Sequence, residues 1–261
     1  MKSSISINYP NNELSLKQAI DELNREWHNF VCKNCASDLS SLYVSDGFYP
    51  YYTHQKIKIL FIGKEALEVS GDYIEELFNA IKSGKIGNKT LNEHKFHALM
   101  LYVVYGLQHN YVDYKNIPYA TEISKDFATP NGISYAFMNL SKFSNESGNW
   151  VSDDALIDSF LRISSMLPEN YFAKEIEILN PDLIIGMNLN EDEKKDRYKF
   201  LGELKYPTHY GNKGQVCAQK LITRYREYNF IDCYHFSAPN KKWDEDYYSP
   251  IVTASKAILH M

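Results

Sequence analysis

The chain has 261 residues, of which 44% are hydrophobic and 23% charged, so it is long enough to bury a core and we expect one globular domain. Its formal net charge of -5 argues against a protein that coats nucleic acid through bulk charge, so any such contact must come from a local basic patch. The sequence has no apolar run of about 18 residues and no apolar signal-peptide core, so we expect a cytoplasmic protein with no membrane partner.

The first 55 residues are predicted to form a helix and an ordered loop that pack on the core of the domain. Apolar residues recur at helical spacing over residues 12–30, which predicts an amphipathic helix. Residues 37–55 mix Ser, Asp, Gly and Pro with aromatic residues and are predicted to be a loop. The α/β part of the domain is predicted over residues 56–261.

An apolar run at residues 57–62 stops abruptly at Gly63, Lys64 and Glu65. This pattern is typical of a buried parallel strand that carries reactive side chains to the carboxyl edge of a sheet. We therefore expect a strand, a turn and a site in this stretch, and later segments are assessed by whether they could meet it there.

Strands and helices are predicted to alternate along the rest of the chain, which indicates an α/β protein. Residues 110–131 have no periodicity and are typical of a binding loop. Apolar runs predict strands at residues 133–139, 181–188 and 228–234. Helices are predicted at residues 72–84, with Asp72 as N-cap, and at residues 91–107, 152–166, 171–179, 191–201, 215–226 and 247–259.

Four of the predicted strand ends carry short motifs: GKEA at residues 63–66, NLSK at 139–142, PDLIIG at 181–186 and HFS at 235–237. In this order and context they resemble the uracil-DNA glycosylase superfamily. The resemblance implies a three-layer α/β/α fold with a central, mainly parallel four-stranded sheet and a site at the carboxyl ends of the strands. It covers the chain from about residue 57 to the C-terminus.

The resemblance also implies a role for individual residues. Glu65 falls where active members of the superfamily hold or activate the attacking water, and His235 falls where a histidine hydrogen-bonds the departing base. Asn139 falls on the residue that reads the polar edge of the pyrimidine in some members. We therefore predict that Glu65 and His235 are catalytic and that the substrate is bound by Gly63, Lys64, Asn139 and Ser237.

These residue types fit the hydrolysis of an N-glycosidic bond. The reaction needs a positioned water, a stabilised oxocarbenium-like sugar and a stabilised leaving base. The Glu65 carboxylate can orient or deprotonate water, and a neutral His235 can donate to a base carbonyl. A base must also leave the DNA stack, which calls for phosphate contacts. We assign these contacts to Lys142, Lys241 and Lys242 and predict a DNA glycosylase that acts on uracil or another altered base; Lys213, Lys220, Arg224 and Arg226 are further candidates.

Simpler interpretations of the same residues remain open. Glu65 can pair with Lys64 or cap the following helix, Asn139 can form a turn, and His235 can be structural. The main alternative function is a non-catalytic nucleic-acid or nucleotide binding protein with the same fold, favoured by Ala66 in place of the superfamily's proline and by the acidic net charge. A third function is hydrolysis of a free nucleoside. The aromatic residue that would stack on the base is left open among Tyr73, Tyr119 and Phe127.

Cys32 and Cys35 form a C-x-x-C pair, a spacing that can bind zinc or an iron–sulfur cluster or act in redox chemistry. Some superfamily members hold such a cluster, but Phe143 stands where their next cysteine follows the second motif. The other two cysteines lie far away in the sequence. We therefore predict plain buried thiols, no metal and no cofactor.

Overall fold

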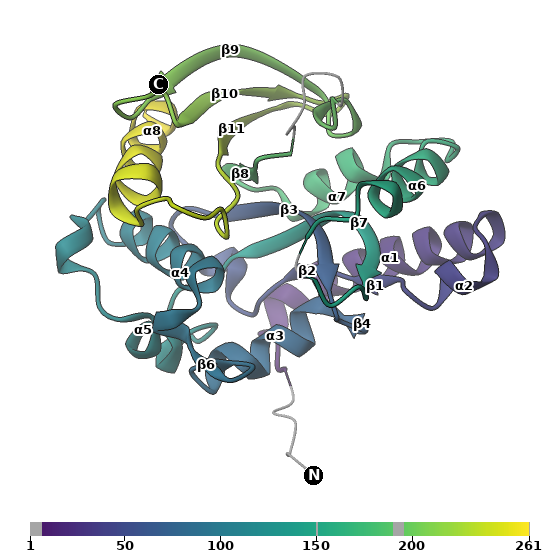
Figure 1. The fold of residues 1–261 in the computed structure, drawn as a ribbon, viewed down its shortest axis with the longest axis horizontal. Coiled ribbons are helices and arrows are strands. Elements are labelled where there is room, and N and C mark those ends of the chain that lie inside the picture. The colour runs from purple at the N-terminus through teal and green to yellow at the C-terminus, as the bar shows by residue number, and fades with distance from the viewer. Residues whose placement is uncertain (1–6, 150, 190–195, 261) are drawn as a thin grey trace.

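The computed structural model describes residues 7–149, 151–189 and 196–260. Within these residues the centre of the molecule is a mixed seven-stranded sheet with the order β2-β7-β3-β8-β11-β10-β9 (Figure 1). Its strands are β2 (Gly47–Phe48), β3 (Ile59–Leu67), β7 (Ala136–Asn145), β8 (Leu183–Met187), β9 (Glu203–Tyr210), β10 (Val216–Ile222) and β11 (Glu227–Cys233).

The sheet is larger than the four-stranded sheet that the sequence predicted. The four expected strands are neighbours at its centre, in the order β7-β3-β8-β11, and they run parallel to one another. Three further strands extend the sheet: β2 pairs antiparallel with β7, and β10 pairs antiparallel with both β11 and β9. The prediction missed the strands at the two edges of the sheet, because these strands lack the continuous apolar run that is typical of a strand buried on both faces.

Helices cover both faces of the sheet (Figure 1), as expected for an α/β protein. One face packs against α3 (Tyr73–Lys82), α4 (Lys95–Gln108), α5 (Ala120–Asp126) and α8 (Ser249–Leu259). The other face packs against α1 (Leu14–Asn34), α6 (Asp154–Ser164) and α7 (Tyr171–Leu179). The short elements are α2 (Ser37–Ser40), β1 (Val44–Ser45), β4 (Gly71–Asp72), β5 (Lys85–Ile86), β6 (Lys89–Thr90) and the single turns η1 (Asn11–Glu13), η2 (Tyr52–His54), η3 (Leu91–Glu93), η4 (Tyr114–Asn116), η5 (Tyr198–Phe200) and η6 (Asp244–Tyr248).

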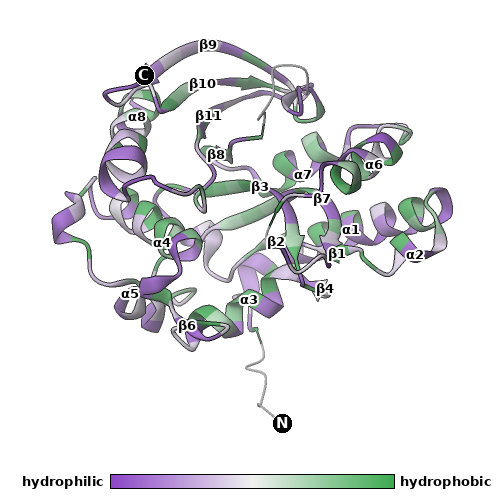
Figure 2. Cartoon of the chain, viewed as in Figure 1, coloured by the Kyte–Doolittle hydropathy of each residue, from purple (hydrophilic) through white to green (hydrophobic). Residues whose placement is uncertain are grey.

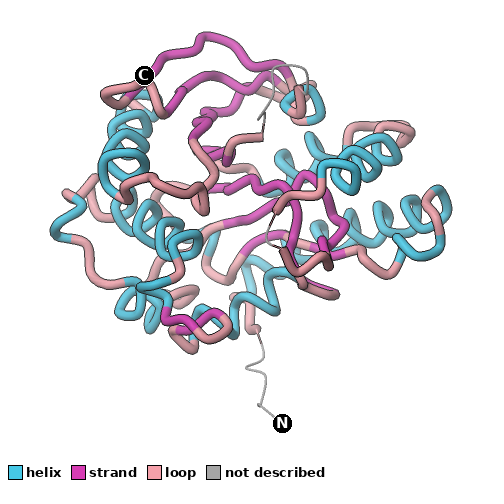
Figure 3. The backbone as a smooth tube through the Cα atoms, viewed as in Figure 1, coloured by secondary structure: helices cyan, strands magenta, loops and turns pink. Residues whose placement is uncertain are grey.

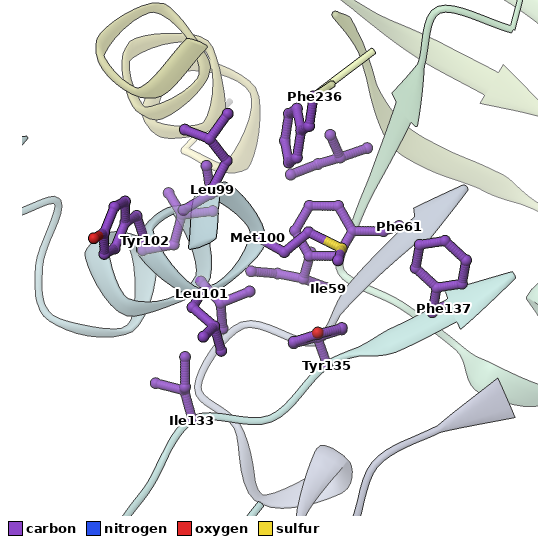
Figure 4. Close-up of a cluster of buried hydrophobic side chains, with 14 of the residues drawn as sticks. Ile59, Phe61, Leu99, Met100, Leu101, Tyr102, Ile133, Tyr135, Phe137 and Phe236 are labelled. Atoms are coloured by element: carbon purple, nitrogen blue, oxygen red, sulfur yellow. The ribbon is translucent and has the colours of Figure 1, made fainter. Parts of the chain in front are cut away.

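The central strand β3 supplies both layers of the hydrophobic core, because successive side chains of a strand point to opposite faces. Phe61 packs on the α4 face with Met100 and Phe236 (Figure 4), and Ile62 packs on the α1 face with Trp27. Hydrophobic residues are accordingly concentrated in the central strands (Figure 2). Full burial of each of these side chains contributes roughly 1.5–3 kcal/mol to folding.

The two strands that carry the first motifs continue past the predicted strand ends. Strand β3 does not stop at Gly63 but runs to Leu67, and its Glu65 pairs in register with Ser141. Strand β7 runs from Ala136 to Asn145 and is buried along its whole length. The predicted strand ends therefore lie inside strands, because each strand continues to pair with its neighbour after its sequence has become polar.

One predicted helix is a strand. Residues 215–226 contain β10, which alternates buried and less buried residues and lies between β9 and β11 (Figure 3). Strand β9 was not predicted, and the loop predicted at residues 37–55 contains the short strands β1 and β2. Residues 191–195 of the helix predicted at residues 191–201 lie outside the described residues, and the described remainder forms only the single turn η5.

The other helix predictions are confirmed, including the helix start at Asp72. The Asp72 side chain accepts hydrogen bonds from the backbone N–H groups of Ile74 and Glu75 at the start of α3. The helices predicted at residues 12–30, 91–107, 152–166, 171–179 and 247–259 correspond to α1, α4, α6, α7 and α8. In the described part of the chain, no helix is long and apolar enough to cross a membrane.

Candidate functional site

The candidate site lies at the carboxyl edge of the parallel strands, where the chain changes direction across the sheet. The chain leaves β3 through α3, α4 and α5 on one face and leaves β7 through α6 and α7 on the other face. The carboxyl ends of β3 and β8, which are neighbours, therefore flank a topological switch point (Figure 1). Such points are where open α/β sheets place their ligand sites.

Gly63 and Asn139, two of the predicted substrate-binding residues, lie side by side inside β3 and β7. They are register partners across β3 and β7. A Cβ atom on Gly63 would lie 2.8 Å from Asn139 Oδ1 and 2.9 Å from Phe137 Cζ, so the absence of a side chain lets both groups lie over β3. The backbone of Asn139 is fixed by a hydrogen bond, because its N–H donates to Asp46 Oδ2 at 2.7 Å. The Phe137 ring stacks on Tyr73 with centroids 4.7 Å apart.

His235 and Ser237 join the same face through aromatic contacts. His235 follows β11, and its ring stacks on Phe96 of α4 with centroids 5.2 Å apart. The Phe96 ring in turn contacts Phe137 at 6.4 Å, which connects His235 to the Gly63 and Asn139 pair. The Ser237 hydroxyl lies 2.7 Å from His235 Nδ1, and the Ser237 backbone N–H donates to the same nitrogen at 3.3 Å.

Glu65 lies on β3 two residues after Gly63, but its contacts are with a different part of the edge. Its Oε1 accepts from the Asp153 backbone N–H at 3.0 Å and lies 3.5 Å from Asn145 Nδ2. Its Oε2 is buried without a hydrogen-bond partner among the described residues. Burial raises the pKa of Glu65 despite these two hydrogen bonds and the nearby charges of Lys64 and Arg197. None of the contacts seen in the described residues joins Glu65 to His235.

Lys64 and Asp232 add a second pair of ionisable groups to the edge. Lys64 is 3% exposed and acts electrostatically on both Glu65 and Asp232. Asp232 lies one residue before the end of β11, and its carboxylate interacts with the Tyr198 hydroxyl and with the backbone of Asn188 and Cys233. Burial raises the pKa of Asp232 to about 6, although hydrogen bonds and Lys64 oppose the shift. Sequence reasoning missed Asp232, and the available signal was a carboxylate inside an apolar strand.

Lys142 does not lie at the surface predicted for DNA contacts. Its side chain is fully buried on the α1 face, where Nζ pairs with Asp46 and lies 2.9 Å from Glu175 Oε2. A phosphate cannot reach this ammonium group, so the predicted contact is wrong. Lys241 and Lys242 follow His235 on the same loop: Lys241 lies 3.9 Å from the Tyr234 ring centroid, and Lys242 is 71% exposed and pairs with Glu245.

The further basic residues divide between the two edges of the sheet. Lys213 lies in the turn between β9 and β10, at the same edge as the end of β11. Arg224 and Arg226 lie at the opposite edge, where they bond to Glu169 and Asn180. Lys220 points to Asn229 within the sheet, 2.6 Å from its Oδ1, and is not part of the site edge.

Two aromatic rings lie next to the predicted substrate residues. Tyr73 stacks on Phe137 beside Gly63, whereas Phe127 is fully buried in the core and Tyr119 is 67% exposed at the start of α5. Phe96 was not predicted because its position in a helical apolar pattern indicated core packing. The structure leaves Phe96 half-buried, with one side of its ring against His235.

The prediction of buried thiols is correct for Cys233 but wrong for Cys32, which is exposed. Burial raises the pKa of the Cys233 thiol well above its usual value. Cys35 and Cys217 are half-buried. Over residues 7–149, 151–189 and 196–260 there is no group of three or more His, Cys, Asp or Glu side chains placed to hold a metal ion.

The edge therefore combines a histidine and an amide beside aromatic rings with two carboxylates whose pKa values are raised by burial. Such a set can bind a flat polar ring, donate a hydrogen bond to it and take a proton from water. Searches against protein-family models, curated proteins and solved structures gave no match to this chain.

Proposed function

We propose that the chain is a DNA glycosylase that hydrolyses the N-glycosidic bond of uracil or another altered base, with an architecture related to the uracil-DNA glycosylase superfamily. The observation that carries the proposal is the connection of Gly63, Asn139 and His235 over one face of the sheet through Phe96 and Phe137. Support for the architecture comes from the four central strands, which are parallel and end at this edge.

The base would be bound between Asn139 and His235. The Ser237 backbone N–H donates to His235 Nδ1, so the neutral imidazole carries its proton on Nε2. This N–H would donate to a carbonyl of the departing base and stabilise the negative charge that develops there. The Asn139 amide would pair with the polar edge of the base, and the nearby Phe96 or Tyr73 ring would stack on it.

The attacking water would be activated by Glu65. Its Oε2 is the carboxylate oxygen without a hydrogen-bond partner among the described residues, and burial raises the pKa of the group toward the pH at which a base is effective. Asp232 is the alternative base, because it is a buried carboxylate near the end of β11 and burial raises its pKa to about 6. In either case the negative carboxylate stabilises positive charge on the sugar.

A non-catalytic nucleotide or nucleic-acid binding protein is the second candidate function. It is favoured by the contacts of Glu65, which go to Asp153 and Asn145 and not to the face that carries His235. In that case the aromatic rings and Asn139 would bind a base without releasing it.

The test is incubation with end-labelled oligonucleotides that contain uracil, hypoxanthine or no lesion, in single- and double-stranded form, followed by alkaline cleavage of abasic sites. We expect cleavage at one lesion and a loss of roughly 100-fold or more in rate in Glu65→Gln and in His235→Ala, the usual effect of removing an acid–base group. Glu76→Gln and His109→Ala are matched controls, because both side chains are exposed, Glu76 on α3 and His109 just after the last residue of α4.

The outcomes separate the candidate functions. Full activity in both Glu65→Gln and His235→Ala would contradict the assigned roles, and loss in Asp232→Asn together with activity in Glu65→Gln would transfer the base role to Asp232. Binding of oligonucleotides that weakens with salt, without any base release, would support the binding protein. Turnover of deoxyuridine but not of oligonucleotides would identify a nucleoside hydrolase.

A further inference from the structure

The amino end of α4 lies beside the proposed base site and carries no side-chain cap. Its N-cap is His94, whose side chain accepts no hydrogen bond from the first turn. The N-cap of α6, Asp153, has almost the same backbone conformation, with φ -92 and ψ 90 against φ -96 and ψ 84, and its side chain accepts from Leu156 N–H at 3.0 Å. The first-turn N–H groups of α4 thus present partial positive charge without an anionic partner on the N-cap.

Two histidines at this helix end have unsatisfied nitrogens. His97, the third residue of α4, is 5% exposed, and its Nδ1 has no hydrogen-bond partner among the described residues. The Nδ1 of His94, a half-buried side chain, also has no partner in the described part of the chain, and the two ring centroids are 4.8 Å apart. Helical side chains lean toward the amino end, which places the His97 ring beside the N-cap. A buried polar group without a partner is costly, so these nitrogens indicate a missing ligand.

The charge state of this pair suits hydrogen-bond donation to an anion. Burial lowers the pKa of His97 to about 3 and also lowers the pKa of His94, so both rings are neutral near pH 7 and each carries one N–H. The neighbouring carboxylates are engaged elsewhere: Glu93 accepts from Thr90, and Asp246 accepts from the Lys242 backbone N–H at 2.8 Å.

The helix end is tied to the loop that carries His235. Lys95 Nζ donates to the carbonyl oxygens of Ala238 and Lys241, each at 2.9 Å, and Phe96 stacks on His235. The amino end of α4 therefore places backbone N–H groups, His94 and His97 next to the ring that would face the base, and Lys95 fixes this end to the loop.

We propose that the amino end of α4, together with His94 and His97, binds a phosphate group, namely the phosphate next to the nucleotide whose base is held by His235. The identity of this phosphate rests on the proposed function, whereas the binding of the anion does not require base release. Helix amino ends with free N–H groups are established sites for phosphate.

The test uses the full-length chain and follows backbone amide resonances during titration with inorganic phosphate, deoxyuridine 5′-monophosphate or a single-stranded oligonucleotide. We expect downfield shifts of the amide protons of residues 95–97 and none at His109, at the other end of α4. His94→Asp should weaken binding about tenfold or more, because the new carboxylate would take the first-turn N–H groups and repel the phosphate.

The aspartate variant is chosen because it should keep the fold. Asp153 caps α6 in the same backbone geometry, so unfolding of His94→Asp should be no easier than that of the wild type. His109→Asp adds the same charge to an exposed position and should leave phosphate affinity unchanged.

Titrations that move no amide of residues 95–97, or equal affinity in a folded His94→Asp variant, would overturn the inference. Tighter binding of the oligonucleotide than of inorganic phosphate would identify a nucleic-acid phosphate, and equal binding of the three probes would identify a small phosphate ligand. Shifts without base release would reject the proposed glycosylase but keep this site. Base release without these shifts would do the reverse.

Discussion

Lys142 is the centre of a buried ionic network on the α1 face of the sheet. Its ammonium pairs with Asp46 and Glu175, all three side chains are fully buried, and the Trp27 ring lies 5.1 Å away. Burial lowers the pKa of Lys142, but the two carboxylates outweigh it and the net shift is upward. Two carboxylates thus share one ammonium, and burial together with Asp46 raises the pKa of Glu175 well above its usual value.

The first residue-scale prediction is that Glu175→Gln stabilises the protein increasingly as the pH rises above about 4.5, the ordinary value for the carboxyl group. In the wild type the native Glu175 keeps a proton that the unfolded chain releases, so its contribution to stability is present at low pH and is lost as pH rises through the folded pKa. The gap between variant and wild type should grow by up to about 1.4 kcal/mol per pH unit in urea unfolding.

Glu177→Gln is the matched control, since Glu177 is exposed on the same helix and bonds to the Tyr228 hydroxyl. A Glu175→Gln profile that runs parallel to the wild type at all pH values would show that Glu175 is ionised in the native protein.

The second residue-scale prediction concerns Gly63. Gly63→Ala should destabilise the protein by roughly 1–3 kcal/mol, because the new methyl group would overlap Asn139 Oδ1 and Phe137 Cζ. The cost should fall in an Asn139→Ala background, where one of the two obstacles is gone, and a double-mutant cycle in urea measures this coupling. Strict additivity of the two substitutions would place Asn139 away from Gly63.

The sequence identified several residues of the candidate site, but it did not show on which face of the sheet each residue lies. Gly63 and Asn139 are register partners inside β3 and β7, and His235, which follows β11, is connected to them through the Phe96 and Phe137 rings. Lys142 was misplaced because β7 was expected to end at Asn139. Since the strand continues, a residue three positions later points to the opposite face.

At the scale of elements, local patterns predicted most helices and the central strands, but not α5, which lies in the loop predicted at residues 110–131. Pairing between distant segments decided much of the rest. Strand β10 carries Gln219 and Lys220, which broke its alternation and favoured a helix in the sequence. Its strand conformation is fixed by hydrogen bonds to β9 and β11, which no local pattern reveals. Asp232 was not predicted for a related reason, because its raised pKa comes from its burial beside Lys64 in the folded chain.

The element-scale prediction is that Asp72→Ala weakens α3. Asp72 Oδ1 accepts from Ile74 N–H at 2.8 Å and from Glu75 N–H at 3.1 Å, and loss of such a cap costs roughly 0.5–2 kcal/mol of unfolding free energy. Urea unfolding of Asp72→Ala measures the cost, and Asp72→Asn should restore most of it because the amide oxygen can accept the same bonds. An equally unstable Asp72→Asn would show that the charge, not the cap, is what matters.

At the scale of the whole molecule, the acidic net charge and the candidate DNA contacts are compatible because the cations are local. Lys95, Lys213, Lys241 and Lys242 lie at the carboxyl edge, where Lys95 donates to two carbonyl oxygens and Lys242 pairs with Glu245. Arg224 and Arg226 lie at the other edge and bond to Glu169 and Asn180. The sequence could bound the total charge, but the distribution of charge depends on the way the strands are ordered.

The position of β3 in the sheet also has a consequence for how the protein is made. Leu60 pairs with Ala136 of β7 on one side and with Ile184 of β8 on the other, so both partners of this strand lie far downstream in the sequence and are synthesised after it. Until both partner strands have been synthesised, the apolar residues of β3 cannot be buried in the sheet. Pairing between segments that are far apart in the sequence slows folding and leaves an apolar strand exposed to aggregation. We therefore expect this protein to depend on chaperones more than a helical protein of the same length does.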